Sequence, residues 1–394
     1  MIIYGTIIDI LAGAATLRKG NGMTTALVLG GGAPNLTLMS GALLALDEAG
    51  VEFDVVSTTG AGMLIGLLYT APARGDRRAA LRNTVDMAVA DPIYDVFPIN
   101  YKVFYKPGPW AEVYAKTMLP WLQALPKATP TQRLWRDWIW FGAAAMSPSD
   151  LNASTLGLCQ PPPWIEHAVN FETIQDFDGD FFMSAYNIDR ARIETFADPE
   201  ITSEHFKAAL AMPFIYSPFT LQGETYIEGS ALETLNFESL IEAKGLHIDT
   251  AVTFDILGQD QLIGKPRSLY DAWVKSIITP LTKLAQQDIE IFENITDKEA
   301  HRHIQPLRLE WADLIPEDHW PKVMDWSESN MRLLFDVGRQ AGERFFARHG
   351  ESLTLKSDKA AGRPGCGKGA AYRPYPHSVP QSSLTGQEKG SPGR

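Results

Sequence analysis

The sequence has few of the residues that mark several common classes of protein. Its two cysteines, Cys159 and Cys366, are too few for a disulfide framework or a zinc ribbon, and they favour a reducing compartment, which we take to be the cytoplasm. Basic residues are also scarce. The 35 Lys and Arg face 47 Asp and Glu, and the net charge of −12 argues against a nucleic-acid binder. The sequence has no uncharged apolar run long enough to be a good bilayer span.

The composition is otherwise that of a globular protein with an unusual tail. Hydrophobic residues make up 45% of the 394 residues, enough for a sizeable core. Residues 351–394 carry seven basic and three acidic residues, whereas residues 1–350 carry 28 and 44, a net charge of −16. The tail is rich in Gly, Pro, Ser and Lys, and we expect it to be disordered. Residues 1–22 are interpreted as an extension before a protein that begins at Met23, or as a short interfacial anchor.

Between residues 23 and 350, predicted strands alternate with predicted helices. Short apolar runs predict strands at 26–29, 53–57, 181–188, 225–228 and 248–257. Apolar residues at helical spacing predict helices at 36–49 and 63–69, with two longer ones in the C-terminal part at about 268–349. This alternation is typical of an α/β fold in which a mostly parallel central sheet has helices on both faces.

The segment at about 94–170 has a different character and predicts a helical insertion. It holds six of the ten tryptophans: Trp110, Trp121, Trp135, Trp138, Trp140 and Trp164. Tryptophan favours places where one end of the ring is dry and the other wet. Two interpretations stay open. Either the tryptophans are packing bulk, or the Trp110–Trp164 region is a lid or a surface that makes peripheral contact with a membrane.

Two turns that join a strand to a helix are the strongest candidates for chemistry. In the first, Gly30, Gly31 and Gly32 follow a strand, so that backbone N–H groups can form an anion or oxyanion site. Neither the Walker spacing nor the dinucleotide fingerprint is present, and we expect no cofactor and no metal. The second turn, Ser57–Met63, has the frame of a nucleophile elbow, the tight turn that exposes the serine oxygen of Gly-x-Ser-x-Gly.

These turns, together with a third motif, resemble the patatin-like phospholipases. Members of that family carry a glycine-rich oxyanion loop, then a Gly-Thr-Ser-Ala-Gly elbow, and finally an Asp-Gly-Gly or Asp-Gly-Ala turn. In this chain, the stretch that runs from Pro213 to Tyr226-Ile227-Glu228-Gly229 resembles the last of these family motifs. The resemblance covers about residues 23–257. It implies a three-layer α/β/α fold and, for intact members, a lipid acyl hydrolase with a Ser-Asp dyad.

The sequence departs from the family pattern at positions that matter for catalysis. Gly60 stands where the family has its nucleophilic serine, and Thr58 stands at the first glycine of the elbow. Glu228 replaces the aspartate of the dyad, and Pro34-Asn35 replaces Arg-Gly in the oxyanion loop. No Gly-x-Ser-x-Gly occurs anywhere in the chain. Because glycine has no side-chain oxygen, Gly60 cannot form an acyl-enzyme.

Three hypotheses of function follow. In the first, the protein binds acyl lipid with little or no hydrolase activity. In the second, it is an active carboxylic ester hydrolase. Glu228 would then activate a water in the volume left by the missing serine, or the neighbouring Thr59 would act as nucleophile. In the third, the protein is a non-enzymatic scaffold that docks on a membrane or a protein.

Overall fold

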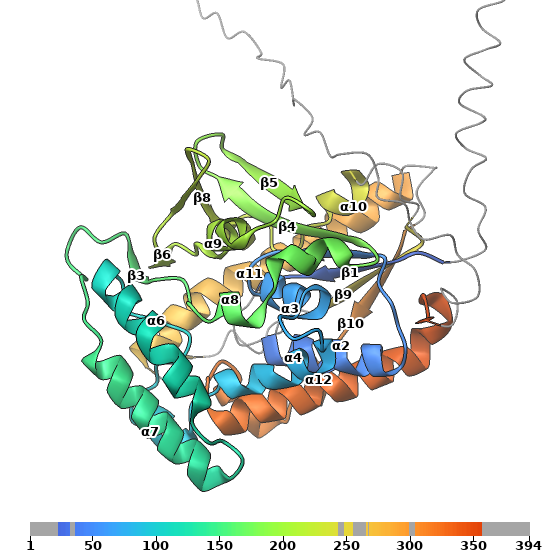
Figure 1. The fold of residues 1–394 in the computed structure, drawn as a ribbon. Helices are drawn as coiled ribbons and strands as arrows, with labels where there is room; N and C mark the ends of the chain where they lie inside the picture. Colours follow the sequence, from blue (N-terminus) through green and yellow to red (C-terminus); the bar gives the residue numbers. More distant parts are fainter. Residues whose placement is uncertain are drawn as a thin grey trace, which may run out of the picture.

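The computed structural model describes residues 23–31, 36–242, 248–254, 265–266, 268–298 and 304–356. The predicted extension at 1–22, the third glycine of the first turn (Gly32) and the tail beyond residue 356 lie outside these ranges. The described part is a mixed α/β fold in which helices flank an eight-stranded sheet (Figure 1).

The central sheet is mostly parallel. Its strands are β1 (Thr25–Leu29), β2 (Val55–Thr58), β4 (Asp180–Asn187), β5 (Arg192–Ala197), β7 (Phe219–Leu221), β8 (Glu224–Glu228), β9 (Thr250–Phe254) and β10 (Gln305–Leu309). Their order is β10-β9-β1-β2-β4-β8-β7, with β5 paired to β4. The pairs from β10 to β4 are parallel, and those made by β5, β7 and β8 are antiparallel. Two short strands, β3 (Gly157–Cys159) and β6 (Phe214–Tyr216), pair separately.

Helices make up most of the rest of the described chain. They are α2 (Leu36–Glu48), α3 (Ala61–Thr70), α4 (Arg77–Arg82), α5 (Asp91–Tyr94), α6 (Pro109–Ala124), α7 (Pro130–Met146), α8 (Ile165–Ala168), α9 (Ser203–Leu210), α10 (Glu238–Glu242), α11 (Leu269–Lys298) and α12 (Glu328–His349). Among the short 3₁₀ helices are η2 (Asn83–Met87) and η4 (Gly229–Ala231). No helix in the described ranges combines the length and apolar character needed to cross a bilayer.

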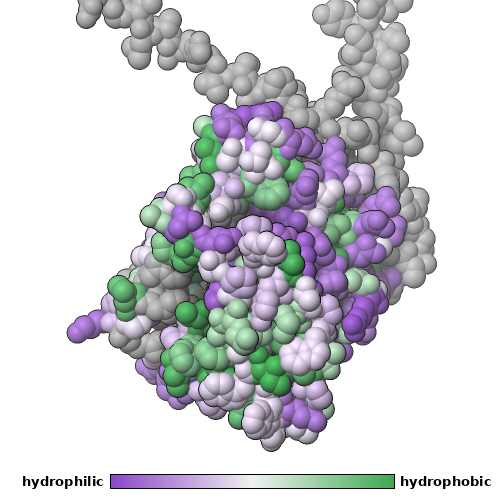
Figure 2. Space-filling model, turned by 60° about the vertical axis from the view of Figure 1, so that its left-hand side comes forward, coloured by the Kyte–Doolittle hydropathy of each residue, from purple (hydrophilic) through white to green (hydrophobic). Residues whose placement is uncertain are grey.

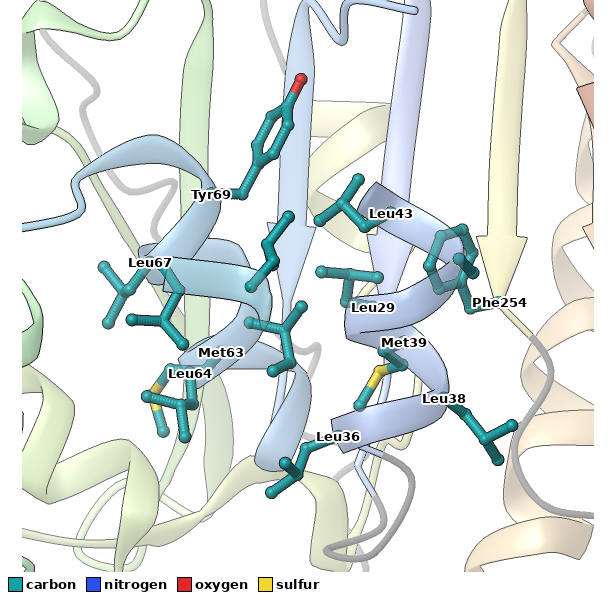
Figure 3. Close-up of a cluster of buried hydrophobic side chains, with 14 of the residues drawn as sticks. Leu29, Leu36, Leu38, Met39, Leu43, Met63, Leu64, Leu67, Tyr69 and Phe254 are labelled. Atoms are coloured by element: carbon teal, nitrogen blue, oxygen red, sulfur yellow. The ribbon is translucent and has the colours of Figure 1, made fainter. Parts of the chain in front are cut away.

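Successive residues of β1 pack on opposite faces of the sheet, because side chains alternate along a strand. Leu27 and Leu29 belong to the large hydrophobic cluster that includes α2, α3 and α12. Ala26 and Val28 belong to a second cluster, which contains Phe292 of α11. Figure 3 shows the first cluster, with Leu29 beside the side chains of α2. The chain therefore forms the three layers that the sequence predicts.

Helices α2 and α12 lie unusually close together, and glycines allow this approach. A Cβ added at Gly338 of α12 would overlap the carbonyl oxygen of Leu38, and one at Gly41 of α2 would overlap that of Phe335. Figure 1 shows α12 running along α2 on the outer side of the fold. As a result, 12 of the 13 residues of α2 are buried between the sheet and α12.

The tryptophan-rich segment forms the helices α6 and α7, which lie beside each other away from the sheet (Figure 1). Helix α7 begins at a capping box in which the Thr129 hydroxyl accepts a hydrogen bond from the Gln132 N–H at 3.2 Å. Pro130 occupies the first turn, where a missing N–H costs nothing. The segment that the sequence predicts to be helical therefore contains two long helices.

Five strands were not predicted from the sequence: β3, β5, β6, β7 and β10. β10 lies between the two predicted C-terminal helices and adds a parallel edge to the sheet beside β9. Its sequence, Gln-Pro-Leu-Arg-Leu, contains a proline and lacks a continuous apolar run. Because an edge strand leaves one row of N–H groups unpaired, it tolerates Pro306 where a central strand would not.

Candidate functional site

The two glycine turns meet at the carboxyl ends of the parallel strands. Strands β1 and β2 are parallel neighbours, so their carboxyl ends lie side by side. The Thr59 N–H donates to the Leu29 carbonyl at 3.0 Å, and the Gly62 N–H donates to the Gly30 carbonyl at 3.0 Å. A Cβ at Gly62 would come within 2.6 Å of the Gly30 carbonyl oxygen, so the close approach of the two turns requires a glycine there.

Gly60 has the backbone of an elbow but no space for an elbow side chain. It precedes α3 with φ 53° and ψ −134°, a conformation that is costly for residues with a Cβ. An added Cβ would overlap the Glu228 Oε1 atom. It would also lie 2.9 Å from the Gly31 Cα and 2.9 Å from the Ser230 Oγ. Gly31, Gly60, Glu228 and Ser230 therefore converge on one point.

Glu228 ends β8 and holds the only acidic group in the wall of the adjoining cavity, as far as the described residues define it. Its side chain is buried, its N–H donates to the Ala211 carbonyl at 3.1 Å, and its Oε1 accepts a short hydrogen bond from the Ser230 hydroxyl. Burial raises the pKa of Glu228 to about 7, although the Ser230 hydrogen bond acts in the opposite direction. Both protonation states are therefore accessible near neutral pH.

The other hydroxyls around the elbow do not face the cavity. The Ser57 Oγ donates to the Asn236 carbonyl at 2.7 Å, and the Thr58 Oγ1 donates to the Phe182 carbonyl at 2.9 Å. Thr59 is fully buried, its hydroxyl has no hydrogen-bond partner among the described residues, and it is not part of the cavity wall. This placement gives Thr59 no path to a bound ester.

An apolar cavity of about 150 Å³ lies beside Gly60 and Glu228. Leu36, Met63 and Leu64, at the starts of α2 and α3, form one side of it (Figure 3). The remaining wall comes from α9, β6, α11 and the segments around Phe104 and Trp326. The side chains in this part of the wall include Phe206, Leu210, Met212, Ile215, Tyr216, Ile278, Leu281 and Met324. An apolar cavity with a single ionisable carboxyl is suited to a hydrocarbon group that ends in a polar function.

Cys159 and Tyr216 face each other across the β3–β6 pair near this site. Burial raises the pKa of the Cys159 thiol to about 12, and burial also raises the pKa of Tyr216. The thiol therefore stays protonated and is a poor nucleophile at neutral pH. Within the described ranges, no group of three His, Cys, Asp or Glu side chains is arranged to hold a metal ion.

The structure brings together four of the five site residues that were singled out in the sequence: Gly30, Gly31, Gly60 and Glu228. Their catalytic and oxyanion roles stay predictions, and Gly32 lies outside the described residues. Sequence reasoning missed Ser230. Ser230 could have been noticed from the sequence, because it follows Glu228-Gly229 at the position where the family turn has glycine or alanine.

Comparison with known protein families agrees with this arrangement. Residues 27–241, more than half of the chain, match the family model described as patatin-like phospholipase. The chain belongs to the patatin-like phospholipase family. The match spans the first glycine turn, the elbow and the Glu228 turn. This patatin-like chain has no match among the curated proteins.

The solved structures that are similar to this patatin-like chain include a bacterial and a human protein. VipD from Legionella pneumophila is 10% identical, with a TM-score of 0.35, and the match covers 84% of this chain and 67% of VipD. Human GIVD cytosolic phospholipase A2, in complex with methyl gamma-linolenyl fluorophosphonate, is 12% identical with a TM-score of 0.41. That match covers 88% of this chain and 61% of the human protein.

Proposed function

We propose that this protein binds the acyl group of a lipid in the apolar cavity without forming an acyl-enzyme. One observation carries the proposal: Glu228 Oε1 fills the position where the side chain of residue 60 would begin, in the wall of an apolar cavity. An acyl-enzyme needs a nucleophilic oxygen at that point, and both the atom and its space are missing. The apolar wall still suits a hydrocarbon chain.

Direct hydrolysis by a water is the second candidate. It is favoured by the pKa of Glu228, about 7, which suits a general base. It is opposed by the geometry, because the carboxylate occupies the volume that the sequence-based hypothesis reserved for the water. The binding role therefore has better support than the hydrolytic one.

The size of the cavity indicates a short acyl group. A dry apolar cavity of about 150 Å³ accommodates a molecule the size of benzene, with roughly six carbons. We therefore expect a hexanoyl group to bind at least as tightly as a dodecanoyl group. Calorimetric titration of the full chain with 1-hexanoylglycerol and 1-dodecanoylglycerol measures this. Leu210→Trp, at a half-buried position in the cavity wall, should abolish binding, whereas Leu232→Trp, at a position 50% exposed outside it, should not.

Restoring the dyad tests whether the site lost only its reactive groups. Gly60→Ser alone introduces a Cβ that overlaps Glu228, so we expect a destabilised and inactive protein. Adding Glu228→Asp withdraws the carboxylate by one methylene. The double variant should regain part of the stability, since the contacts of the added Cβ with the Gly31 Cα and the Ser230 Oγ remain, and it should hydrolyse p-nitrophenyl hexanoate, which the wild type should only bind. Wild-type hydrolysis that disappears in Glu228→Gln would favour the water mechanism, and failure of every acyl chain to bind would refute the proposal.

A membrane surface is the partner that the exposed tryptophans favour. Trp110 and Trp121 on α6 and Trp135 and Trp138 on α7 are between 45% and 72% exposed. Figure 2, which brings this side forward, shows hydrophobic residues gathered on the lower half of the molecule. We propose that this aromatic face, defined by the four tryptophans, inserts at the interface of a bilayer, where tryptophan is enriched.

A further inference from the structure

A larger cavity lies next to the apolar one. It has a volume of about 420 Å³ and lies between α4 and η2 on one side and α6, α7 and α8 on the other. Its wall contains five basic or titratable nitrogen side chains: Arg74, Lys102, Lys127, Arg136 and His167. This concentration is unusual in a chain whose net charge is −12, and it indicates a site for an anion.

The acidic groups near this cleft are already engaged. Asp76 caps α4 and accepts a hydrogen bond from the Ala79 N–H at 2.9 Å. Asp86 forms a short ion pair with Lys127, and the buried Asp137 pairs with Lys102 at 2.6 Å. These ion pairs balance the charges of both lysines in the wall. The positive charge without a counterpart in the cleft therefore comes chiefly from arginine.

Arg136 is a buried cation whose Nε has no acceptor. The residue is only 8% exposed, its Nε has no hydrogen-bond partner, and it makes no ion pair within the described residues. Its one specific contact is with the ring of Trp140, whose centroid lies 5.2 Å from the guanidinium carbon. A cation–π contact offsets only part of the cost of burying an unpaired charge. An anion that enters the cleft would supply the missing acceptor.

We propose that this cleft binds a phosphate group and that Arg136 is its principal ligand. Guanidinium offers paired donors that match phosphate oxygens, and Arg74 and His167 supply further donors around the same volume. A tetrahedral dianion can engage several donors from different directions, whereas a carboxylate presents only two oxygens in one plane. The number and spread of donors therefore favour phosphate.

The cleft and the apolar cavity share two wall residues, Met87 and Trp164. The indole of Trp164 is fixed by its N–H, which donates to the Lys102 carbonyl at 3.1 Å. One ligand can therefore place an acyl chain in the apolar cavity and a phosphate in the cleft. This second half of the inference, a phosphate-bearing acyl lipid, rests on the proposed function, whereas the anion site itself does not.

Calorimetric titration of the full chain with three probes tests the inference. The probes are 1-hexanoylglycerol 3-phosphate, 1-hexanoylglycerol and inorganic phosphate. The wild type should prefer the phosphorylated lipid to the neutral one by about tenfold or more, as expected for hydrogen bonds to a charged group. Arg136→Gln should remove this preference without changing the affinity for 1-hexanoylglycerol. Lys116→Gln, an equal loss of charge on an exposed α6 residue outside the cleft, should leave it intact.

The outcomes separate the two proposals. A preference that persists in Arg136→Gln, or is absent from the wild type, would overturn the anion site. Binding of 1-hexanoylglycerol without a phosphate preference would leave the proposed function standing alone. Arg136-dependent binding of inorganic phosphate, with no binding of either lipid, would keep the anion site and reject the lipid. If Arg136→Gln does not fold, Arg74→Gln, at an exposed position in the same wall, should weaken the preference about threefold.

Discussion

At the scale of single residues, Gly60 and Glu228 act as one unit. Glutamate is longer than aspartate by one methylene, and its Oε1 reaches the place where a Cβ of residue 60 would lie. A buried carboxyl at this point is costly unless it is protonated or hydrogen-bonded, and Ser230 provides the hydrogen bond. The two departures from the family pattern therefore explain each other sterically.

Glu228→Gln tests the cost of this buried carboxyl. Burial raises the pKa of Glu228 from 4.5 to about 7, so the folded protein holds the proton more tightly than the unfolded chain does. The free energy of unfolding should therefore be highest below pH about 4.5 and should fall by about 3 kcal/mol as the pH rises to about 7. Glu228→Gln should remove this fall. Urea unfolding between pH about 5 and about 8 measures it, and a wild-type curve parallel to that of the variant would contradict it.

The sequence could predict which site residues are unusual but not how they meet. Gly60 and Glu228 stood out because each departs from a motif. Nothing in the spacing of Glu228 and Ser230 indicated their hydrogen bond, and the wall around the carboxyl includes residues of α3 and α11, which lie far from it in the sequence. The burial of Arg136 could not be predicted, since an arginine in a helix is ordinarily exposed.

At the scale of elements, the contact between α2 and α12 depends on the absence of side chains. Both helices were predictable from apolar periodicity, which reports a buried face but not what covers it. Glycine lowers helix propensity, and α12 contains Gly338 and Gly342. The structure shows that they permit backbone contact instead, because an added Cβ at Gly338 would overlap the Leu38 carbonyl oxygen.

Two Gly→Ala substitutions in helices should therefore act in opposite directions. Gly338→Ala forces α12 away from α2, and we expect a loss of about 2 kcal/mol in the free energy of unfolding despite the better helix propensity. Gly142→Ala in α7 meets no atom within 4 Å, so it should stabilise the protein by up to about 1 kcal/mol. Chemical denaturation of both variants gives the answer. Equal effects would show that propensity alone decides.

At the scale of the whole molecule, the net charge and the local surfaces differ in character. An overall charge of −12 opposes adhesion to anionic lipid, yet the molecule has a cleft lined by several basic side chains and an aromatic face. The sequence located the tryptophans but left open whether they pack or face solvent. The structure shows that some of the tryptophans pack and others face solvent. Trp140 is buried against Arg136, whereas Trp110 and Trp135 are exposed.

Membrane contact through the aromatic face should be independent of lipid charge. We expect the protein to sediment with neutral phosphatidylcholine vesicles at low and high salt, because burial of apolar rings drives the contact. Trp121→Ser combined with Trp135→Ser should abolish binding. Leu269→Ser, which removes an 89% exposed apolar side chain on α11, should not. Binding that requires anionic lipid, or that survives the double substitution, would contradict this role for the face.

The overlap between position 60 and Glu228 also fixes the order in which two substitutions can install a serine at position 60. A serine that appears first meets the glutamate carboxylate and is penalised before it can contribute activity. An aspartate that appears first shortens the acid and moves the carboxylate away from position 60. The route to a serine at position 60 therefore begins with a substitution at position 228.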